Sequence, residues 1–284
     1  MAATKLLVGL IGSGIQLSLT PAMQEEEARH QGLRLHYQLI DLDQTPGSVQ
    51  QLPALLASAR IMGFAGLNIT YPCKQAVMPL LDELSPEAEA MGAVNTVVLR
   101  DGRLVGHNTD GSGWAWGFHR ALPKADLGCV VLLGAGGAGS AISHAVLSLG
   151  AVQLRLVDTD LARARALAAA LNARFGDRVV AYGDAAQVIE GATGLIHATP
   201  TGMDKLPGMP ILARLLRASM WVSEIVYFPI RTELLEAARA LGCPTVDGGA
   251  MAVGQAVGAF ELFTGIKADA ARVEQHFKRL LAGR

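Results

Sequence analysis

The chain has 284 residues, with 24 basic and 25 acidic side chains, and 51% of its residues are hydrophobic. A formal charge of −1 gives no general attraction to nucleic acid or to acidic membranes, so we expect neither as a partner. The apolar content argues against extended disorder, and the length is sufficient for two domains.

The cysteines Cys73, Cys129 and Cys243 are odd in number and lie far apart in the sequence. They form no C-x-x-C motif and no Cys/His ligand spacing, which argues against a disulfide framework and against a zinc site. We expect no metal. A reducing, cytoplasmic location fits best, and no uninterrupted apolar stretch is long enough to span a bilayer.

The first 110 residues predict alternating strands and helices. Strands are expected at 6–11, 35–42 and 66–70, and helices at 21–30, with Thr20 as N-cap, and at 49–58. A turn at 71–74 leads into another helix. Residues 93–100 and 103–107 then predict a hairpin around Asp101-Gly102. This part of the chain predicts an α/β domain.

Residues 111–121 predict a helix that leads into a second series of strands. These strands are expected at 130–133, 154–157, 179–182, 194–197, 221–226 and 245–246, alternating with helical stretches. The pattern predicts a doubly wound parallel sheet over residues 111–247. Two helices follow, at 251–263 and 269–281, and we expect the first of them to return to the earlier domain, which then comprises 1–110 and 248–284.

Three glycines, Gly134, Gly136 and Gly139, follow the strand at 130–133 as a G-x-G-x-x-G motif. Such glycines allow a tight turn, close approach of backbone amides to a pyrophosphate, and packing of helix on strand. Asp158 ends the next strand, where a carboxylate accepts hydrogen bonds from the adenosine ribose of NAD and repels the 2′-phosphate of NADP. The alternative is an ordinary glycine-rich turn with Asp158 capping a helix. The motif favours a Rossmann-type dinucleotide domain.

Polar residues also cluster where the strands of the first domain end. They are Ser18, Thr20, Asn68, Thr70, Lys74, Asn95, Thr96, Asn108, Thr109 and Asp110. In open α/β sheets ligands bind at the carboxyl ends of strands, so these groups can converge on one polyhydroxy substrate. Each residue also has a local alternative role, as a cap, a turn residue or a solvated charge.

Seven motifs, in the same order over nearly the whole chain, resemble those of the shikimate dehydrogenase family, including its NAD-linked quinate/shikimate branch. They lie at residues 18–21, 66–74, 92–96, 108–111, 134–139, 198–203 and 248–256. The resemblance implies an α/β enzyme with an N-terminal substrate domain and a dinucleotide domain. It also implies a monomer or homodimer that binds a polyhydroxy cyclohexane or cyclohexene carboxylate.

The resemblance assigns Lys74 and Asp110 as the pair that handles the proton when an alcohol is oxidised. A nearby carboxylate favours the ammonium form of a lysine, so which of the two accepts the proton first stays open. The implied substrate-binding residues are Ser18, Thr20, Asn68, Thr70, Asn95 and Gln255, with Ser18 and Thr20 at the substrate carboxylate. The commonest family pattern has serine where this chain has Thr20, which leaves the preference between shikimate and quinate open.

The implied cofactor-binding residues are Gly134, Ala135, Gly136, Gly137, Ala138, Asp158, Arg163, Thr199, Met203, Val226, Tyr227, Gly248 and Met251. NADP-dependent members of the family that this chain resembles have Asn-Arg-Thr after the second strand, where this chain has Asp158-Thr159-Asp160. Two carboxylates would repel the 2′-phosphate, so we expect NAD as cofactor. Arg163 offers a partner for a phosphate, which leaves weaker use of NADP open. Met203 and Met251 have an alternative role as core residues.

The expected function is an NAD-preferring dehydrogenase that interconverts shikimate and 3-dehydroshikimate, with quinate and 3-dehydroquinate left open as a second pair. Three alternatives remain from the sequence. They are an aminoshikimate dehydrogenase, a non-catalytic metabolite sensor with the same fold, and a one-carbon folate dehydrogenase of similar two-domain build.

Overall fold

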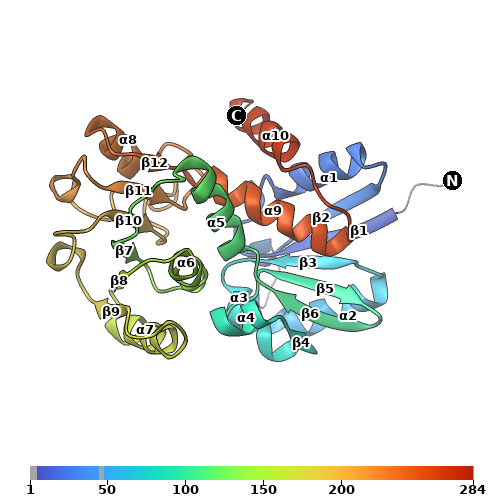
Figure 1. Cartoon of the computed structure of the whole chain (residues 1–284). Coiled ribbons are helices and arrows are strands. Elements are labelled where there is room, and N and C mark those ends of the chain that lie inside the picture. The colour runs from blue at the N-terminus through green and yellow to red at the C-terminus, as the bar shows by residue number, and fades with distance from the viewer. Residues whose placement is uncertain (1–4, 45–47, 284) are drawn as a thin grey trace. The chain divides into compact units, whose positions relative to one another are not determined.

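The structure is a computed structural model that describes residues 5–44 and 48–283 of the chain. The described residues form two compact units (Figure 1). The first unit runs up to Thr109 and resumes at Val253, and the second spans Asp110–Ala252. Helix α9, Gly248–Thr264, therefore begins in the second unit and continues in the first.

The first unit contains a mixed sheet in the order β2-β1-β3-β5-β6-β4. Its strands are β1 (Lys5–Gly12), β2 (Arg34–Asp41), β3 (Gly66–Ile69), β4 (Glu83–Leu84), β5 (Thr96–Arg100) and β6 (Arg103–His107). β1 pairs parallel with β2 and β3, whereas β5 pairs antiparallel with β3 and β6. Asp101 and Gly102 join β5 to β6 with positive φ angles, which confirms the predicted hairpin.

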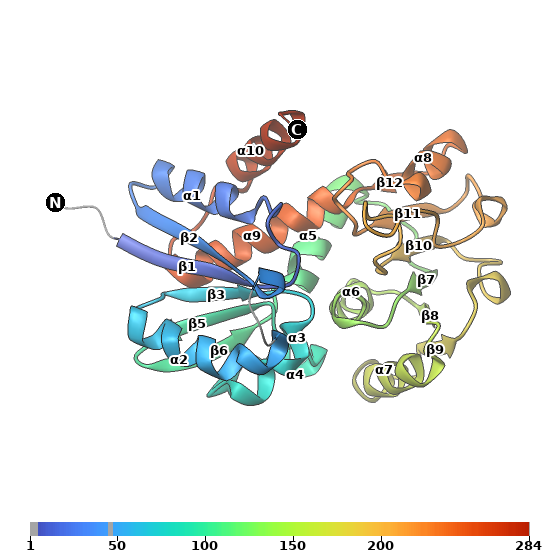
Figure 2. The same cartoon turned by 180° about the vertical axis from the view of Figure 1, so that it is seen from behind.

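Helices cover both faces of this sheet, α9 on one face and α2 on the other, as Figures 1 and 2 show from opposite sides. Val8 and Leu10 of β1 pack with Phe263 of α9, whereas Ile11 packs with Leu52 of α2. This alternation along β1 is typical of a strand with helices on both faces. The other helices are α1 (Thr20–His30), α2 (Leu52–Met62), α3 (Cys73–Ala76), α4 (Pro86–Met91) and α10 (Ala270–Ala282).

Two local predictions for this unit are wrong. Thr20 is the first residue of α1 and not its N-cap; Leu19 occupies that position, and the Thr20 amide donates to Ser18 Oγ at 3.3 Å. The second helix begins three residues later than predicted, because Ser48–Gln51 form a 3₁₀ turn before Leu52. Pro53 in the first turn of α2 fits that start, since proline there lacks only an amide that has no partner inside the helix.

The second unit contains a sheet in the order β12-β11-β10-β7-β8-β9, and all neighbouring strands pair parallel. Its strands are β7 (Cys129–Leu133), β8 (Gln153–Val157), β9 (Val179–Tyr182), β10 (Gly194–His197), β11 (Trp221–Glu224) and β12 (Thr245–Val246). The predicted doubly wound sheet is confirmed. The strand order reverses between β7 and β10, and ligands of such sheets bind outside the carboxyl ends of the strands at that point.

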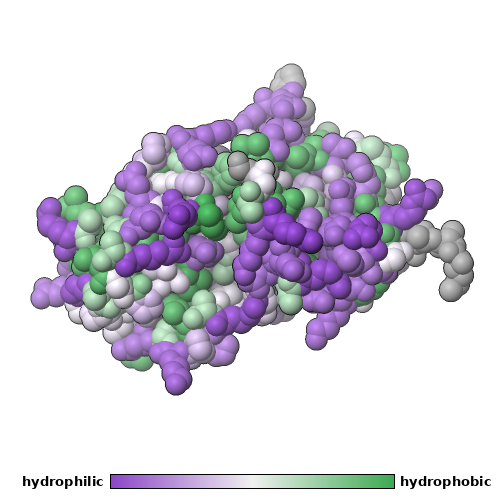
Figure 3. Space-filling model, turned by 90° about the horizontal axis from the view of Figure 1, so that it is seen from above, coloured by the Kyte–Doolittle hydropathy of each residue, from purple (hydrophilic) through white to green (hydrophobic). Residues whose placement is uncertain are grey.

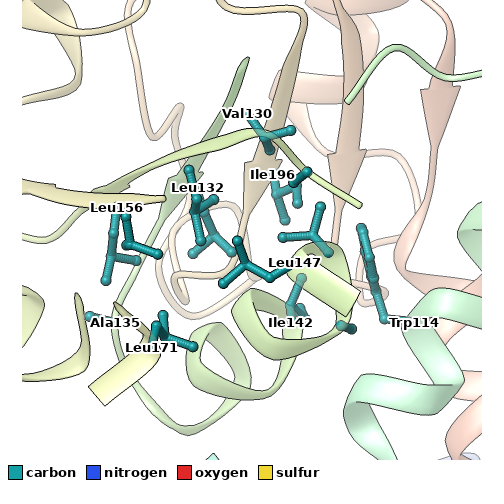
Figure 4. Packing of buried hydrophobic residues seen from close by; sticks show 14 of the residues in the cluster. Trp114, Val130, Leu132, Ala135, Ile142, Leu147, Leu156, Leu171 and Ile196 are labelled. Carbon is teal, nitrogen blue, oxygen red and sulfur yellow. The ribbon is translucent and has the colours of Figure 1, made fainter. Parts of the chain in front are cut away.

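Helices α5 (Asp110–Ala121), α6 (Gly137–Ser148) and α7 (Leu161–Phe175) pack on one face of this sheet, and α8 (Glu233–Ala240) packs on the other. Figure 4 shows Leu132 and Ile196 of the sheet facing Leu147 of α6 in the larger core cluster. Trp114 of α5 joins this cluster, and its Nε1 donates to Ser223 Oγ at 3.0 Å. This close packing fixes the strand ends that carry the site.

Hydrophilic residues are interspersed with smaller hydrophobic areas on the face that Figure 3 shows. Over residues 5–44 and 48–283, no helix is both long and apolar enough to cross a bilayer.

Candidate active site

The turn between β7 and α6 contains three glycines with different physical roles. Gly134 has a φ of +102°, and a Cβ there would lie 2.6 Å from the Ala198 carbonyl oxygen. A Cβ on Gly139 would lie 1.9 Å from the Gly134 carbonyl oxygen. The packing of the turn therefore excludes larger side chains at both positions.

Gly136 is not required by packing. Its φ is −77°, which any residue adopts, and a Cβ there would meet no atom within 4 Å. Gly136 is also the N-cap of α6 and has no side chain to accept from the first-turn amides. An open glycine at the N-terminus of a 12-residue helix fits close approach of an anion such as a pyrophosphate.

Asp158 follows β8, and its carboxylate is held by four hydrogen bonds. Oδ2 accepts from the Ala135 amide at 2.7 Å and from Arg163 Nε at 3.2 Å. Oδ1 accepts from Arg163 Nη2 at 2.7 Å and from the Asp160 amide at 2.8 Å. Burial alone would raise the pKa of Asp158, but the hydrogen bonds from Arg163 and the two amides outweigh it and hold the pKa below its usual value.

These contacts place a fixed negative charge beside the glycine turn. The alternative that Asp158 caps a helix is wrong, because Asp160 is the N-cap of α7 and accepts from the Arg163 amide at 3.1 Å. Asp158 is therefore a buried carboxylate that directly follows β8 and is hydrogen bonded to the glycine turn.

The other predicted cofactor residues of the second unit follow β10 and β11 or begin α9. Thr199 and Met203 lie in the loop after β10, and Val226 and Tyr227 lie in the loop after β11. A Cβ on Gly248 would lie 2.5 Å from the Val226 carbonyl oxygen, so the start of α9 packs against the second loop.

The two methionines differ in burial. Met203 is 41% exposed and so is not a core residue, whereas Met251 packs against the larger core cluster. The alternative role as a core residue therefore fits Met251 and is wrong for Met203.

Sequence reasoning missed a buried acid and base in the same unit. His197 ends β10 and Glu224 ends β11, and the two residues are register partners in neighbouring strands. His197 Nδ1 lies 2.8 Å from Glu224 Oε1, and neither side chain is exposed. The available signal was a titratable residue at the end of each of two mainly apolar strand sequences, GLIH and WVSE.

In the first unit, Asn95, Thr109 and Gln255 come together from three segments. Asn95 Oδ1 accepts from the Thr109 amide at 2.8 Å, and Asn95 Nδ2 donates to Thr109 Oγ1 at 2.9 Å. Thr109 Oγ1 in turn donates to the Gln255 carbonyl oxygen at 3.1 Å. Lys74 adjoins this group through its backbone, since its carbonyl accepts from the Val94 amide at 2.9 Å.

Asn68 is engaged on all sides by protein groups. Its Oδ1 accepts from Tyr37 Oη at 2.8 Å and from Gln24 Nε2 at 3.5 Å. Its Nδ2 donates to Thr96 Oγ1 at 3.1 Å and to the Asn95 carbonyl oxygen at 3.3 Å. Asn68 is 4% exposed, and these four hydrogen bonds fix its side chain between β3 and the start of β5.

The remaining predicted residues lie at element ends. Ser18 and Thr20 are at the start of α1, and Thr70 directly follows β3, where its amide donates to the Ile11 carbonyl oxygen at 2.9 Å. Asp110 is the buried first residue of α5, where the helix dipole favours a carboxylate. By residue type, the first unit offers hydroxyl, amide and amine groups for a polar substrate, and the second unit offers a dinucleotide site.

Comparison with known proteins agrees with this arrangement. Residues 10–97 match the model of the shikimate dehydrogenase substrate binding domain, and residues 250–276 match that of the shikimate 5′-dehydrogenase C-terminal domain. A shikimate dehydrogenase (NADP(+)) of Streptomyces avermitilis is 55% identical over 96% of this chain and 95% of its own length. A quinate/shikimate dehydrogenase (NAD(+)) of Corynebacterium glutamicum strain R is 48% identical over 97% of this chain and 99% of its own.

Among solved structures, the quinate dehydrogenase from Corynebacterium glutamicum in complex with NAD superposes with a TM-score of 0.91. The two sequences are 47% identical, and the match covers 97% of this chain and 99% of the quinate dehydrogenase chain. The resemblance that the seven motifs indicated is confirmed, and the chain belongs to the shikimate dehydrogenase family.

Proposed function

We propose that the protein is an NAD-preferring oxidoreductase that interconverts shikimate and 3-dehydroshikimate. The observation that carries the cofactor choice is the buried, ionised carboxylate of Asp158 beside the glycine turn. Overall similarity does not decide it, because the relatives include an NADP(+) enzyme at 55% identity and an NAD(+) enzyme at 48%. A 2′-phosphate placed against Asp158 is repelled, whereas ribose hydroxyls donate to it.

The residues of the second unit suit the three parts of NAD. The backbone of Gly134–Ala138 and the N-terminus of α6 suit the pyrophosphate, and Asp158 suits the adenosine ribose. Thr199, Met203, Val226, Tyr227, Gly248 and Met251 are assigned to the nicotinamide side. Bound NAD would take up a hydride from the substrate alcohol.

Oxidation of a secondary alcohol also releases a proton, which a nearby base must accept. We assign this proton to Lys74 and Asp110 together. An amine and a carboxylate that share a proton titrate as a pair, so the proposal does not divide the step between them.

The substrate we propose is a hydroxylated cyclohexene carboxylate, with the related cyclohexane carboxylate, quinate, as a second substrate. Ser18 and Thr20 are assigned to the carboxylate. Asn68, Thr70, Asn95 and Gln255 are assigned to the hydroxyl groups. Neutral hydroxyl and amide groups discriminate alcohols well, because a missing partner leaves a buried polar group unsatisfied.

The test is steady-state kinetics of the purified protein with shikimate and with quinate, each with NAD and with NADP. We expect a higher kcat/KM with NAD than with NADP for either alcohol. A protein that reduces neither cofactor with either alcohol over a broad pH range would contradict the proposal. A preference for NADP would contradict the role of Asp158 but not the proposed reaction.

A further inference from the structure

We propose that the buried pair of His197 and Glu224 positions the two loops that hold the nicotinamide half of the cofactor. The inference rests on the proposed function, because the nicotinamide side is assigned there. It adds two positioning residues to the reaction, neither of which contacts the reacting atoms. We call His197, Glu224 and their hydrogen-bonded neighbours Thr199 and Thr232 the strand-end network.

The pair is completely enclosed. His197 Nδ1 lies 2.8 Å and 3.0 Å from the two oxygens of Glu224, and both side chains are 0% exposed. Burying such groups is costly unless every polar atom is hydrogen bonded. A pair of this kind is therefore poor evidence for added stability, and its presence at two adjacent strand ends calls for another role.

One end of the network enters the loop after β10. His197 Nε2 lies 2.5 Å from Thr199 Oγ1, and the Thr201 amide donates to the same oxygen at 3.3 Å. Through its two ring nitrogens His197 therefore links the Glu224 carboxylate to the Thr199 hydroxyl.

The other end enters the loop after β11. Glu224 Oε1 accepts from the Val226 amide at 2.9 Å, and Oε2 accepts from Thr232 Oγ1 at 3.0 Å. Thr232 is also the N-cap of α8, where its hydroxyl accepts from the Leu235 amide at 3.3 Å. The network thus ties both loops and the start of α8 to the rigid ends of two neighbouring strands.

Both loops carry residues assigned to the nicotinamide side, Thr199 and Met203 in one and Val226 and Tyr227 in the other. The first residue of each loop is still tied to a neighbouring strand end, since the Ala198 amide donates to the Leu133 carbonyl oxygen at 2.8 Å and the Ile225 amide donates to the His197 carbonyl oxygen at 3.2 Å. The residues assigned to the nicotinamide side follow these two and lie outside the strands. The Ala198 carbonyl packs closely against Gly134, since a Cβ on Gly134 would lie 2.6 Å from the Ala198 carbonyl oxygen. Displacement of the first loop would therefore also disturb the glycine turn. Misplacement of groups around a reacting centre by about 1 Å can lower a rate by about 10²-fold.

The test measures binding of NADH and of ADP-ribose, which lacks the nicotinamide half. In His197→Asn the shorter amide can still donate to Glu224 but no longer reaches Thr199. We expect the dissociation constant of NADH to rise about tenfold while that of ADP-ribose stays within about twofold of the parent. We also expect kcat to fall with little change in the KM of the alcohol.

Ser223→Ala is the matched control. Ser223 lies next to Glu224 on β11, and its hydroxyl accepts from Trp114 Nε1 on the opposite face. This variant loses a buried hydrogen bond and should melt at a lower temperature, with an unchanged ratio of NADH to ADP-ribose affinity. If His197→Asn fails to fold, Glu224→Gln keeps the side-chain volume, and the same ratio decides.

Equal weakening of NADH and ADP-ribose, or no change in either, would overturn the inference. Both titrations are independent of turnover. If the parent oxidises neither alcohol but His197→Asn still shows the selective loss of NADH affinity, the inference stands and the proposed substrate is refuted. A parent that binds neither ligand would refute both.

Discussion

The Arg163 guanidinium holds the Asp158 carboxylate in a two-point ion pair, with Nη2 2.7 Å from Oδ1 and Nε 3.2 Å from Oδ2. Asp158 is 8% exposed, whereas the Arg163 side chain is 51% exposed on α7. The carboxylate of Asp158 is thus buried and fixed, and the guanidinium of Arg163 is accessible to solvent. In the proposed function the acid selects against a 2′-phosphate. Arg163 uses Nε and Nη2 on the acid, and the further N–H donors of a guanidinium could still meet a phosphate.

Asp158→Asn should therefore shift cofactor preference toward NADP. The amide keeps the shape and some hydrogen bonds of the carboxylate but removes the charge that repels a 2′-phosphate, and it releases Arg163. We expect the ratio of kcat/KM for NADP to that for NAD to rise about tenfold or more, equivalent to about 1.4 kcal/mol. Steady-state kinetics with saturating shikimate measures this ratio.

Asp160→Asn is the matched control for that change. Asp160 is exposed, caps α7 and is the second carboxylate of the Asp158-Thr159-Asp160 run. Because asparagine caps a helix as well as aspartate does, this variant should keep the stability of the parent and shift the cofactor ratio less than Asp158→Asn does. An Asp158→Asn protein with the cofactor ratio of the parent would show that Asp158 does not read the ribose.

Gly136→Ala should separate binding from folding in the glycine turn. A Cβ at Gly136 meets no protein atom within 4 Å, so the melting temperature should stay close to that of the parent. The same methyl group would occupy the space that a pyrophosphate approaches, and NADH affinity should fall by about tenfold or more. Calorimetric titration with NADH and a thermal melt measure the two effects.

Gly139→Ala provides the contrast, because its Cβ would lie 1.9 Å from the Gly134 carbonyl oxygen. This variant should lose several degrees of melting temperature, since the backbone of the turn has to move. If Gly136→Ala binds NADH as the parent does, the open glycine is not a cofactor contact.

Lys74→Met should lower kcat by about 10²-fold or more, because it removes the amine assigned to the proton. Asp110→Asn should have a comparable effect, and the double variant should be little worse than either single variant if the two act as a unit. NADH affinity should not change. Lys124→Met is the control, because Lys124 is exposed and its loss should leave turnover equal to that of the parent. Unchanged turnover in Lys74→Met would show that Lys74 has no catalytic role.

Much of the fold follows from short-range patterns in the sequence. Strands such as β7 and β8 are apolar runs bounded by glycine or aspartate, and their alternation with helices identifies a parallel sheet without knowledge of any contact. Two-residue β4 was missed because Glu83 and Leu84 carry no periodic signal and form a strand only beside β6. The cap of α1 was misplaced by one residue, because Ser18 and Thr20 are both ordinary cap residues.

The site shows the same division. The place of Asp158 beside the glycine turn could be predicted because its spacing from the glycines is fixed by one βαβ unit. His197 and Glu224 are 27 residues apart and meet only through strand register. The engagement of Asn68 by Tyr37 and Thr96 also depends on which strands are neighbours. The motif series identified which residues are candidates, and only the structure separates supporting groups from exposed ones.

A last prediction concerns the stability of the first unit. Glu27 of α1 is 1% exposed, and its two oxygens accept from Arg272 of α10 at 2.7 Å each. Burial alone would raise the pKa of Glu27, but hydrogen bonds from Arg272, the Asp269 amide and Gln31 outweigh it, so the pKa lies below its usual value. Ionised Glu27 therefore stabilises the fold at pH values above the unfolded pKa of about 4.3.

Glu27→Gln should lower the free energy of unfolding at pH 7 by about 2 kcal/mol, measured by urea denaturation. Because this stabilisation is lost as the pH falls through the folded pKa of Glu27, the difference between parent and variant should shrink at pH values below about 4. Glu274→Gln is the control, since its pairing with Lys278 on the surface of α10 contributes only about 0.5 kcal/mol or less. A constant difference between parent and Glu27→Gln from pH 7 to pH 3 would show that burial and shape hold α1 against α10, and that the charge of Glu27 does not.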